Sequence, residues 1–566
     1  MKKWTVMKKV MLAVMVAACV SGCGKQSATS VESDNKTGNT ETTQTKESET
    51  AIEETLADAE YDDDATIVWG LTSQWADLTP FDNSAGGYYS GMINSLIYDK
   101  LVYCKMDGSI EERAAQNWEV SEDKKIFTFY LNPNSKFHDG EPATAEDWVF
   151  AAKLLANPEA GFADHSPAMS IIAGTNDTGD LIDEENFGFK ALDSTTLEIT
   201  LKNSMNASTF LQTYSYYYTC LPEHILGECD PVDIVANEFF TKPIGSGPCK
   251  FENLNAGSEL TLSRNTEYPI GEAHYSKMVY KIMSTTALAT ALMTGEIDIP
   301  YVGVTTDEAL ELESAENLQV NLGESADSLM WMPINNKRVT DVRIRQAINY
   351  AINKELIATQ LQQGLAEPVE TFLAPGSEYI PDSIQYEYNP EKAKELLEAA
   401  KAEGYDGKFI IATPSGIRER MCALMEQDLE KIGFDVEIQV MEAATMFAEL
   451  KSGADCSFDA GVVGRGISPD VCYFNADLNY QMTGYPSVTD PTYVEYQEKF
   501  IAAQSEEEAN EIMSEYLEYV HEQCPIVFLT ASKSYRVFSD RVGDIGADYS
   551  AISMRDFGVW NWKVSK

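Results

Sequence analysis

The stretch Ser328–Lys354 constrains the fold more than any other part of this chain. It opens with the apolar run Leu329–Met332, breaks at Pro333, and continues with apolar residues at helical spacing, where Thr340 or Asp341 can cap a helix. The apolar face of this helix comprises Ile344, Ala347, Ile348, Ala351 and Ile352. We interpret the stretch as a strand that leaves one lobe, followed by the first helix of another lobe. An ordinary strand–loop–helix inside one domain is the alternative interpretation.

Length and charge narrow the possibilities further. A chain of 566 residues is too long for one hydrophobic core, so two or three lobes are expected. The chain has 42 basic and 90 acidic residues, which gives a formal net charge of −48. This charge argues against nucleic-acid binding, because a phosphate backbone requires a cationic face. It also creates a long-range field that attracts cations and repels anions.

The N-terminus has the features of an export signal. Four lysines lie among the first nine residues, and the apolar run Val10–Val20 that follows is too short to span a membrane as a mature helix. The ending Val20–Cys23 resembles a bacterial lipobox, which predicts a signal peptide over residues 1–22 and diacylation (palmitate-type anchoring) of Cys23. Acyl chains of this kind would hold the chain at a membrane surface. A plain signal peptide with cleavage elsewhere is the alternative.

Residues 23–64 are predicted to be the lipidated cysteine followed by a disordered linker. The segment is rich in Ser, Thr and Glu and has almost no aliphatic periodicity. Such a composition cannot bury enough apolar surface to offset its conformational entropy. We therefore expect a tether between lipid and folded body, ended by the acidic run Asp62–Asp64.

Motifs between residues 97 and 155 carry a family resemblance. Lys125–Leu131 predicts a strand, and Thr144 predicts a helix cap to which Asp147 reaches back. We expect Val149, Phe150 and Leu154 to form the buried stripe of this helix. The string that contains Asn117–Ser121, Lys136–Gly140 and Thr144–Asp147 resembles the signature of the family 5 extracellular solute-binding proteins, the peptide/nickel-type receptors of ABC importers.

Further matches to that family follow in order along the chain, from Ile67 to Trp562. They comprise Phe189–Leu201, Pro243–Phe251, Leu260–Asn265, Ala291–Ile299, the opening stretch Ser328–Lys354, and Asn389–Glu403. In the last of these, Asn389 caps a helix, Pro390 takes its first position and Gly404 lies just past its end.

The resemblance implies a fold. It is an α/β fold of the periplasmic-binding-protein type II kind, with two lobes joined by two crossing strands and an inserted extra α+β domain, the arrangement called cluster C. Transferred to this chain, it predicts the following boundaries: domain I over 65–95, 200–330 and 529–566; the inserted domain II over 96–199; and domain III over 331–528. The crossings are expected near Leu329–Pro333 and Ile526–Thr530.

The resemblance also implies a function without bond-making chemistry. Such proteins enclose a solute between lobes that close by a hinge motion, and deliver it to a membrane permease coupled to a cytoplasmic ATPase. Peptide receptors of the family hold the main chain of the ligand like an added β-strand. We therefore expect an extracytoplasmic, lipid-anchored monomer that requires no cofactor and no metal, on the outer surface of a Gram-positive cell or in a periplasm.

One family position departs from its pattern. Peptide receptors often place an Asp a few residues before a Pro to pair with the ligand's ammonium group, but no Trp or Asp stands at the expected places in Phe458–Phe474. Here Arg465 precedes Pro469 by four residues and Asp470 follows it. Asp470 can replace the missing carboxylate, Arg465 can hold a ligand carboxylate, or the ligand lacks a free amine. An Arg465 that pairs with a nearby acid and takes no part in binding is the structural alternative.

The predicted ligand contacts come from both lobes. They are Ser73, Gln74 and Trp75 on a loop of domain I, Val463, Gly464, Arg465, Asp470 and Tyr473 in domain III, and Trp331 at a crossing. Trp75 offers an apolar face that can cover a ligand. A surface tryptophan packed on a neighbouring element is the alternative for this residue.

The sequence lacks several motifs of common enzyme classes. The chain contains no His-Glu-x-x-His and no Gly-x-Ser-x-Gly, and Gly245–Pro248 lacks the Lys and the following helix of a phosphate loop. An extracytoplasmic enzyme on the same scaffold is therefore the less favoured class. Within the receptor class, a nickel chelate, an oligosaccharide or a carboxylate-bearing small molecule are the alternatives to a peptide.

Cysteine usage leaves two alternatives open. Eight cysteines follow Cys23, and an even number in an exported protein permits disulfides. Cys220/Cys229 and Cys456/Cys472 are the pairs nearest in sequence. Buried thiols are the alternative, and the spacing is not that of a zinc site.

Overall fold

The computed structural model describes residues 61–566, except 73–74, 76–77, 82–87, 106–108, 302–303, 324–325, 378, 386, 451, 468–489, 504, 544 and 546–557. The predicted signal peptide and nearly all of the predicted linker lie outside the described residues. So do five predicted functional residues, namely Cys23, Ser73, Gln74, Asp470 and Tyr473.

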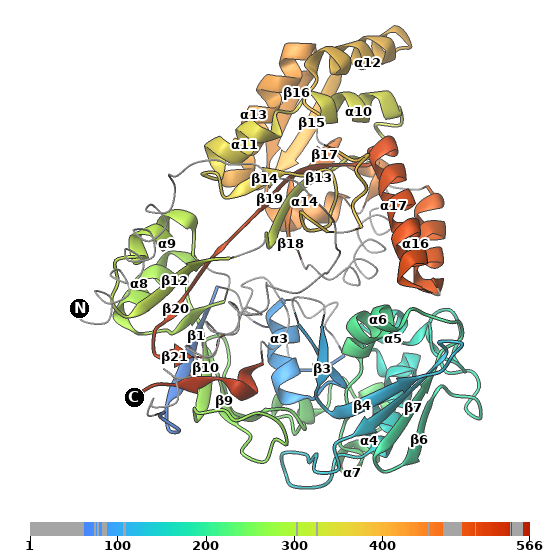
Figure 1. The fold of residues 1–566 in the computed structure, drawn as a ribbon, viewed down its shortest axis with the longest axis vertical. Coiled ribbons are helices and arrows are strands. Elements are labelled where there is room, and N and C mark those ends of the chain that lie inside the picture. Colours follow the sequence, from blue (N-terminus) through green and yellow to red (C-terminus); the bar gives the residue numbers. More distant parts are fainter. Residues whose placement is uncertain are drawn as a thin grey trace, which may run out of the picture. The chain divides into compact units, whose positions relative to one another are not determined.

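A five-stranded sheet is built around β1, the first strand of the described chain (Figure 1). Its strand order is β11-β1-β10-β9-β8, with β1 parallel to both neighbours and the remaining pairs antiparallel. The sheet therefore joins the start of the folded chain to residues more than 180 positions later. The strands are β1 (Thr66–Leu71), β8 (Cys249–Asn255), β9 (Glu259–Arg264), β10 (Lys277–Ile282) and β11 (Ile299–Pro300); helices from the same parts of the chain are α3 (Tyr88–Ile97), α8 (Leu288–Thr294) and α9 (Thr306–Leu312).

A second, four-stranded sheet is entirely antiparallel, in the order β4-β5-β7-β6. Helix α4 begins after Thr144, whose backbone N–H and hydroxyl both donate to Asp147 Oδ2, at 2.9 and 3.0 Å. The predicted cap is therefore confirmed. The elements are β2 (Val102–Cys104), β3 (Ile110–Glu112), β4 (Ala115–Val120), β5 (Ile126–Leu131), α4 (Ala145–Leu155), α5 (His165–Met169), β6 (Phe189–Asp193), β7 (Thr196–Thr200), α6 (Ala207–Thr209) and α7 (Glu223–Leu226).

The predicted buried stripe of α4 is partly wrong. Leu154 is buried, but Val149 and Phe150 are only half-buried. Trp148, Ala151, Ala152 and Leu155 form the core-facing side instead. The apolar run Trp148–Ala152 covers more than one face of a helix, so periodicity left the rotation open. The large indole of Trp148 takes the core position.

The glycines of Gly245–Pro248 are required by close packing. Gly247 N donates to the carbonyl of Ile97 at 2.9 Å, and a Cβ on Gly245 would lie only 1.9 Å from that oxygen. His138 Nδ1 accepts from Gly245 N–H at 3.2 Å, and Nε2 faces the Gly247 carbonyl at 3.1 Å. Burial lowers the pKa of His138 to about 4, so the ring is neutral and donates through Nε2. The motif thus fixes the end of α3 to the turn that contains His138.

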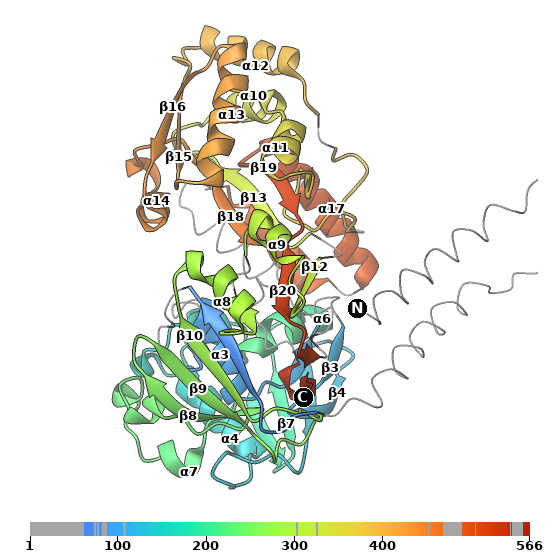
Figure 2. The same cartoon turned by 90° about the vertical axis from the view of Figure 1, so that its left-hand side faces the viewer.

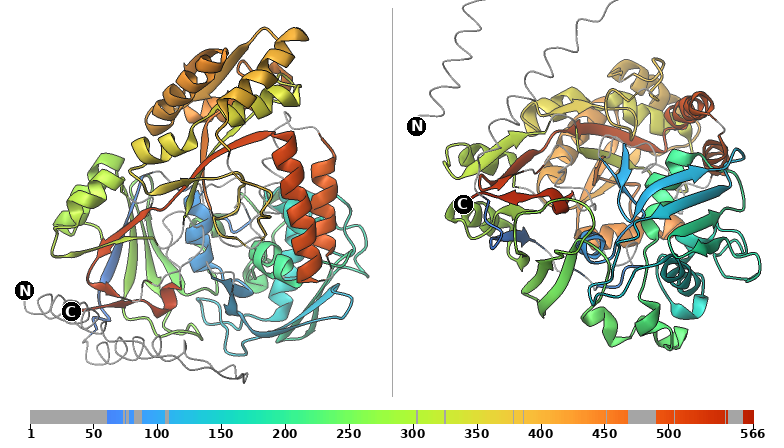
Figure 3. Two further views of the ribbon diagram at one scale, coloured as in Figure 1. Left: turned by 45° about the horizontal axis from the view of Figure 1, so that its top comes forward. Right: turned by 60° about the horizontal axis from the view of Figure 1, so that its bottom comes forward.

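A third region follows the crossing strand β13. It contains a parallel sheet in the order β16-β15-β17 together with several helices. Asp341 caps α10, because its side chain accepts a hydrogen bond from Arg343 N at 2.9 Å. Asn389 caps α12 as predicted, accepting from Lys392 N at 3.0 Å. The elements are α10 (Val342–Ala351), α11 (Lys354–Leu361), α12 (Pro390–Ala402), β15 (Lys408–Thr413), α13 (Ile417–Ile432), β16 (Asp435–Val440), α14 (Ala443–Leu450), β17 (Ala460–Gly461), α16 (Thr492–Ala502) and α17 (Glu506–Gln523). Figure 3 shows α16 and α17 side by side, in red.

Strands β13 and β19 lie at the positions of the two predicted crossings, and the remaining strands of the described chain are grouped with them here. They belong to two sheets, β14-β19-β13-β18 and β12-β20, and a short pair, β21-β22, lies near the C-terminus. The strands are β12 (Leu318–Leu322), β13 (Ser328–Pro333), β14 (Ala366–Pro368), β18 (Val463–Gly466), β19 (Ile526–Ser532), β20 (Tyr535–Ser539), β21 (Val542–Gly543) and β22 (Lys563–Val564). The domain boundaries given above stay a prediction.

The described cysteines are free thiols: Cys104, Cys220, Cys229, Cys249, Cys422, Cys456 and Cys524. Cys220 lies 3.1 Å from Ser246 Oγ, while Cys229 accepts from Asn237 Nδ2 at 3.2 Å, so this pair is not bonded. Cys472 lies outside the described residues. Burial raises the pKa of the Cys422 and Cys524 thiols to about 12. These two groups therefore stay protonated at neutral pH.

Candidate functional site

The candidate site is organised around β13, which pairs with two antiparallel neighbours. On one side it pairs with β19, from Ser328 opposite Ser532 to Pro333 opposite Ile526. On the other side it pairs with β18, from Ser328 opposite Gly466 to Trp331 opposite Val463. β18 is the outermost strand of this sheet, and no further described strand pairs with it. An edge strand offers backbone N–H and C=O groups to an added strand.

The predicted ligand residues of β13 and β18 divide between the core and the surface. Trp331 and Val463 are each 1% exposed and pack in the same apolar core, where the Trp331 ring lies 5.8 Å from that of Phe528. The backbone of Gly464 is exposed, and a Cβ there would lie 3.1 Å from the Met330 side chain. The backbone of Arg465 pairs with Leu329. Their roles as ligand contacts stay predictions.

Trp75 packs inside the first lobe. It is 4% exposed and belongs to the core that also contains Trp69 and Phe81. The indole is therefore buried and is not the surface tryptophan of the alternative interpretation. Its role as a ligand contact stays a prediction, and its neighbours Ser73 and Gln74 lie outside the described residues.

Among the described residues, hydrogen bonds remote from the β13 ladders join segments before β13 to segments between β13 and β19. Asn206 N donates to the Ile501 carbonyl of α16 at 3.1 Å, and Ile501 packs against the core of the first lobe. Gln363 Nε2 donates to Asp307 Oδ1 of α9 at 2.8 Å. Contacts of this kind form or break when lobes move about a hinge.

A buried ion pair lies beside β14, and sequence reasoning missed it. Lys354 is fully buried and its Nζ contacts Glu370 Oε1, whose side chain is 6% exposed. Asn349 Nδ2 donates to Glu370 Oε2 at 2.9 Å, and His521 Nδ1 lies 3.5 Å from the same oxygen. Burial alone would raise the pKa of Glu370, but the Lys354 charge and these hydrogen bonds hold it below its ordinary value. Lysine at the first position of a helix normally indicates a solvated side chain, so no local signal exposed this pair.

Asp327 is a second buried carboxyl near the crossings. It is 5% exposed and directly precedes β13. Ser534 Oγ donates to Asp327 Oδ1 at 2.7 Å. Burial raises the pKa of Asp327 despite this hydrogen bond.

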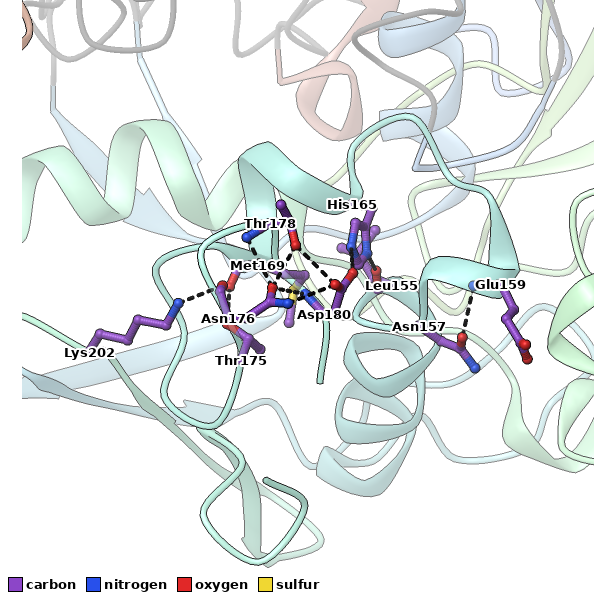
Figure 4. A network of polar contacts seen from close by, with 10 residues as sticks. All are labelled: Leu155, Asn157, Glu159, His165, Met169, Thr175, Asn176, Thr178, Asp180 and Lys202. Atoms are coloured by element: carbon purple, nitrogen blue, oxygen red, sulfur yellow. Dashed lines mark hydrogen bonds and ion pairs between the residues drawn. The ribbon is translucent and has the colours of Figure 1, made fainter. Parts of the chain in front are cut away.

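A polar loop near the second sheet satisfies its own charged groups (Figure 4). Asp180 receives hydrogen bonds from Asn176 Nδ2 at 2.7 Å and Thr178 Oγ1 at 2.9 Å, and lies 2.9 Å from His165 Nε2. These bonds lower the pKa of Asp180. Lys202 Nζ donates to the Asn176 carbonyl at 2.7 Å. The contacts tie α5, the loop and the end of β7 together, which is a structural role.

Two cavities in the described part of the chain have no residue of β18 in their lining. One of about 220 Å³ is in the first lobe, and one of about 150 Å³ borders Glu370. The first is lined by Pro248, Arg264, Asn265, Thr266, Tyr268, Ile270, Gly271, Glu272, Ala273, Tyr275 and Trp560. The second is lined by Pro368, Val369, Glu370, Thr371, Leu373, Pro375, Ile380 and Ile384. None of the predicted ligand residues lines either cavity, so cavity size does not locate the candidate site.

Two further features are not found among the described residues. No group of three or more His, Cys, Asp or Glu side chains there is arranged to hold a metal ion. None of the helices in that part of the chain combines the length and apolar character needed to cross a bilayer.

Comparison with known proteins gives relatives over most of the chain. Oligopeptide-binding protein AppA of Bacillus subtilis (strain 168) is 26% identical over 443 residues, covering 70% of this chain and 76% of the relative. The nickel-binding periplasmic protein of Escherichia coli (strain K12) is 26% identical over 388 residues, covering 63% and 68%. The solved structure of Bacillus subtilis AppA in complex with a nonapeptide has a TM-score of 0.70 at 21% identity, covering 90% of this chain and 100% of that chain.

These likenesses confirm the predicted fold class. It is the α/β, type II periplasmic-binding-protein fold. β13 and β19 lie where the two crossings are predicted, and they pair with each other. Residues 109–485, more than half of the chain, match the family described as "Bacterial extracellular solute-binding proteins, family 5 Middle". The chain belongs to the family 5 bacterial extracellular solute-binding proteins.

Proposed function

We propose that this protein is the extracytoplasmic substrate-binding lipoprotein of an ABC importer, and that it captures an oligopeptide between its lobes for delivery to the permease. The observation that carries the proposal is the position of β18 at the edge of the sheet that contains β13 and β19, the strands of the predicted crossings. A peptide added to this edge would receive main-chain hydrogen bonds irrespective of its side chains. Gly464 and Gly466 would let a second backbone approach closely.

The naming of the relatives supports a peptide as ligand. AppA of Bacillus subtilis is named for oligopeptide binding, and its solved structure holds a nonapeptide. We propose that the Asp470 carboxylate pairs with an ammonium group of the ligand or that the Arg465 guanidinium holds a ligand carboxylate. Ser73, Gln74, Trp75, Trp331 and Tyr473 complete the proposed contact set. No step of capture needs a nucleophile or a cofactor, so we assign the protein no enzymatic activity.

The proposal includes a lipid anchor at Cys23, left after removal of residues 1–22. The tether that follows would hold a monomeric receptor at the outer face of the cell membrane, within reach of the permease. Its support is the lysine-rich start, the short apolar run and the lipobox-like ending of the sequence. Cys23→Ala should release the protein from membranes, measured by fractionation and by the loss of lipid mass from the purified chain.

A second candidate is the same receptor role for a nickel chelate, which the similarity to the Escherichia coli nickel-binding protein favours. The two candidates differ in what the purified protein retains. We expect mass spectrometry of denatured protein to release peptides, and a screen of di- to hexapeptides to raise the melting temperature. A peptide at 100 times its dissociation constant stabilises by about 2.7 kcal/mol. Release of nickel with a small chelator, with no response to any peptide, would refute the peptide assignment.

A further inference from the structure

The pairing between the two chains of the predicted crossings shifts register between Met330 and Trp331, and it is interrupted a second time beyond Ser328. The β13–β19 ladder ends at Ser328 opposite Ser532, and the β12–β20 ladder resumes at Leu322 opposite Tyr535. The first chain passes through 323–327 between these ladders, whereas the second passes only through 533–534. Figure 2 shows β20 continuing from β19 with β12 beside it. Because the two connections differ in length, the register of one ladder does not continue into the other.

Specific hydrogen bonds bridge the interruption. Gly323 N donates to the Ser534 carbonyl and Asp327 N donates to the Ser532 carbonyl, each at 3.0 Å. Ser534 Oγ donates to Asp327 Oδ1 at 2.7 Å. The carboxyl group of Asp327 is buried, and a buried carboxylate without a donor is strongly destabilised. The Ser534 hydroxyl is the side-chain donor to this carboxylate, which the backbone N–H of Ser534 and the charge of Arg536 also stabilise, so residues of the second crossing chain hold Asp327 in this arrangement.

Asp327 also holds the end of the proposed ligand strand. Ile467 directly follows β18, and its N–H donates to the Asp327 carbonyl at 2.8 Å. One residue thus contacts both crossing chains and the strand proposed to receive the solute. A rotation of the lobes that separates Asp327 from Ser534 would shift the anchor of β18.

We propose that Asp327 and Ser534 form a hinge lock that couples the angle between the lobes to the position of β18. They are positioning residues, since neither is assigned contact with solute. The proposal rests on the proposed function where it treats β18 as the ligand strand. The lock itself concerns the ligand-free protein, and it can be tested in the absence of any solute.

Hydrogen–deuterium exchange of the full-length protein tests the lock. The segments measured are 460–467, which contains β18, and 526–537, which contains the second crossing. Ser534→Ala removes the side-chain donor to the buried Asp327 carboxylate and leaves only its backbone donors and the charge of Arg536, so exchange in both segments should rise about tenfold. The double variant Asp327→Ala/Ser534→Ala removes both partners and should exchange more slowly than Ser534→Ala alone. Asp327→Asn keeps an acceptor and Ser534→Thr keeps a donor, so both should stay near wild type.

Ser258→Ala is the matched control, because Ser258 Oγ donates to the Asn255 carbonyl in the β8–β9 turn, outside the crossings. Small-angle X-ray scattering should show a changed radius of gyration in Ser534→Ala and none in Ser258→Ala. If Ser534→Ala does not fold, the comparison of Asp327→Asn with the double variant carries the test. Exchange equal to that of Ser258→Ala, or effects that simply add in the double variant, would overturn the lock. A wild-type protein that ignores every peptide would refute the proposed ligand and leave this result standing.

Discussion

Replacing Lys354 by Met should destabilise the lobe that contains it at neutral pH. The variant keeps a side chain of similar length and apolar character, but it leaves Glu370 buried without its cation. The remaining partners of Glu370 are Asn349 and His521, of which only the imidazole can become charged. Removing one member of a buried ion pair costs about 3–5 kcal/mol. At 2–4 °C per kcal/mol, the unfolding temperature of this lobe should fall by roughly 6–20 °C.

The pH dependence gives this prediction a distinctive sign. In the wild type the pKa of Glu370 is lowered, so its contribution to stability is full above about 4.5 and is lost as pH falls below that value. Without Lys354, burial becomes the dominant influence and raises the pKa of Glu370. The folded variant then binds a proton more readily than the unfolded chain. Its deficit relative to wild type should shrink as pH falls from 8 toward 5.

Differential scanning calorimetry at pH 5, 6, 7 and 8 measures both effects. Lys153→Met is the control, because Lys153 pairs with Glu184 at 2.9 Å on the surface, where both side chains are exposed. That variant should unfold close to the wild-type temperature at every pH. An unfolding temperature of Lys354→Met within about 2 °C of wild type at pH 7, a small fraction of the expected shift, would refute this account of the pair. A deficit independent of pH would show that the lost packing of the lysine stem, and not the uncompensated charge, causes the destabilisation.

Three further predictions concern residues of the scaffold. Because the pKa of His138 is lowered to about 4, stability should fall by about 3 kcal/mol as pH drops from 6.5 to 4, and His138→Asn should flatten this slope in calorimetry. Gly245→Ala should destabilise by more than about 4 kcal/mol, seen as lost soluble yield, because its Cβ would overlap the Ile97 carbonyl; Gly543→Ala, where the nearest atom is 3.6 Å away, should be tolerated. Thr530 Oγ1 is buried with no hydrogen-bond partner among the described residues, so Thr530→Val should stabilise by about 1 kcal/mol, and a lowered melting temperature would contradict this.

Local signals predicted the elements that position the site. The strand Leu329–Met332 and the helix after Asp341 were expected from an apolar run, a break and a capping residue, and both are confirmed in β13 and α10. All five predicted apolar residues of that helix are buried. These features depend on neighbours within a few positions in the sequence. The two crossings were placed by resemblance, and strands lie there as expected.

Contacts between distant residues could not be predicted in the same way. The rotation of α4 about its own axis depends on which of its side chains pack against the second sheet. All residues of the run Trp148–Ala152 are apolar, so several rotations would bury apolar side chains. The burial of Lys354 depends on Glu370 and on His521 of α17, which is 167 positions away from Lys354. Nothing in the sequence around Lys354 points to Glu370 or His521 as its partners, and nothing around those two residues points to Lys354. The site residues Asp470 and Tyr473 lie outside the described residues, so their prediction stands untested.

The composition of β18 explains why the preferred side chains of a peptide ligand are harder to derive than the way its main chain would pair. Its sequence, Val463-Gly464-Arg465-Gly466, has a glycine on each side of its one charged residue, and Val463 is committed to the core. A strand of this kind offers its main chain, which is the same for every peptide. Under the proposed function, discrimination among peptides would then fall largely to long-range charge. The net charge of −48 creates a field that favours the approach of cationic solutes and opposes anionic ones, with an effect that weakens as salt is added. The receptor would thus bind the main chain of peptides of any sequence, and its preference among peptides would appear mainly in their association rates.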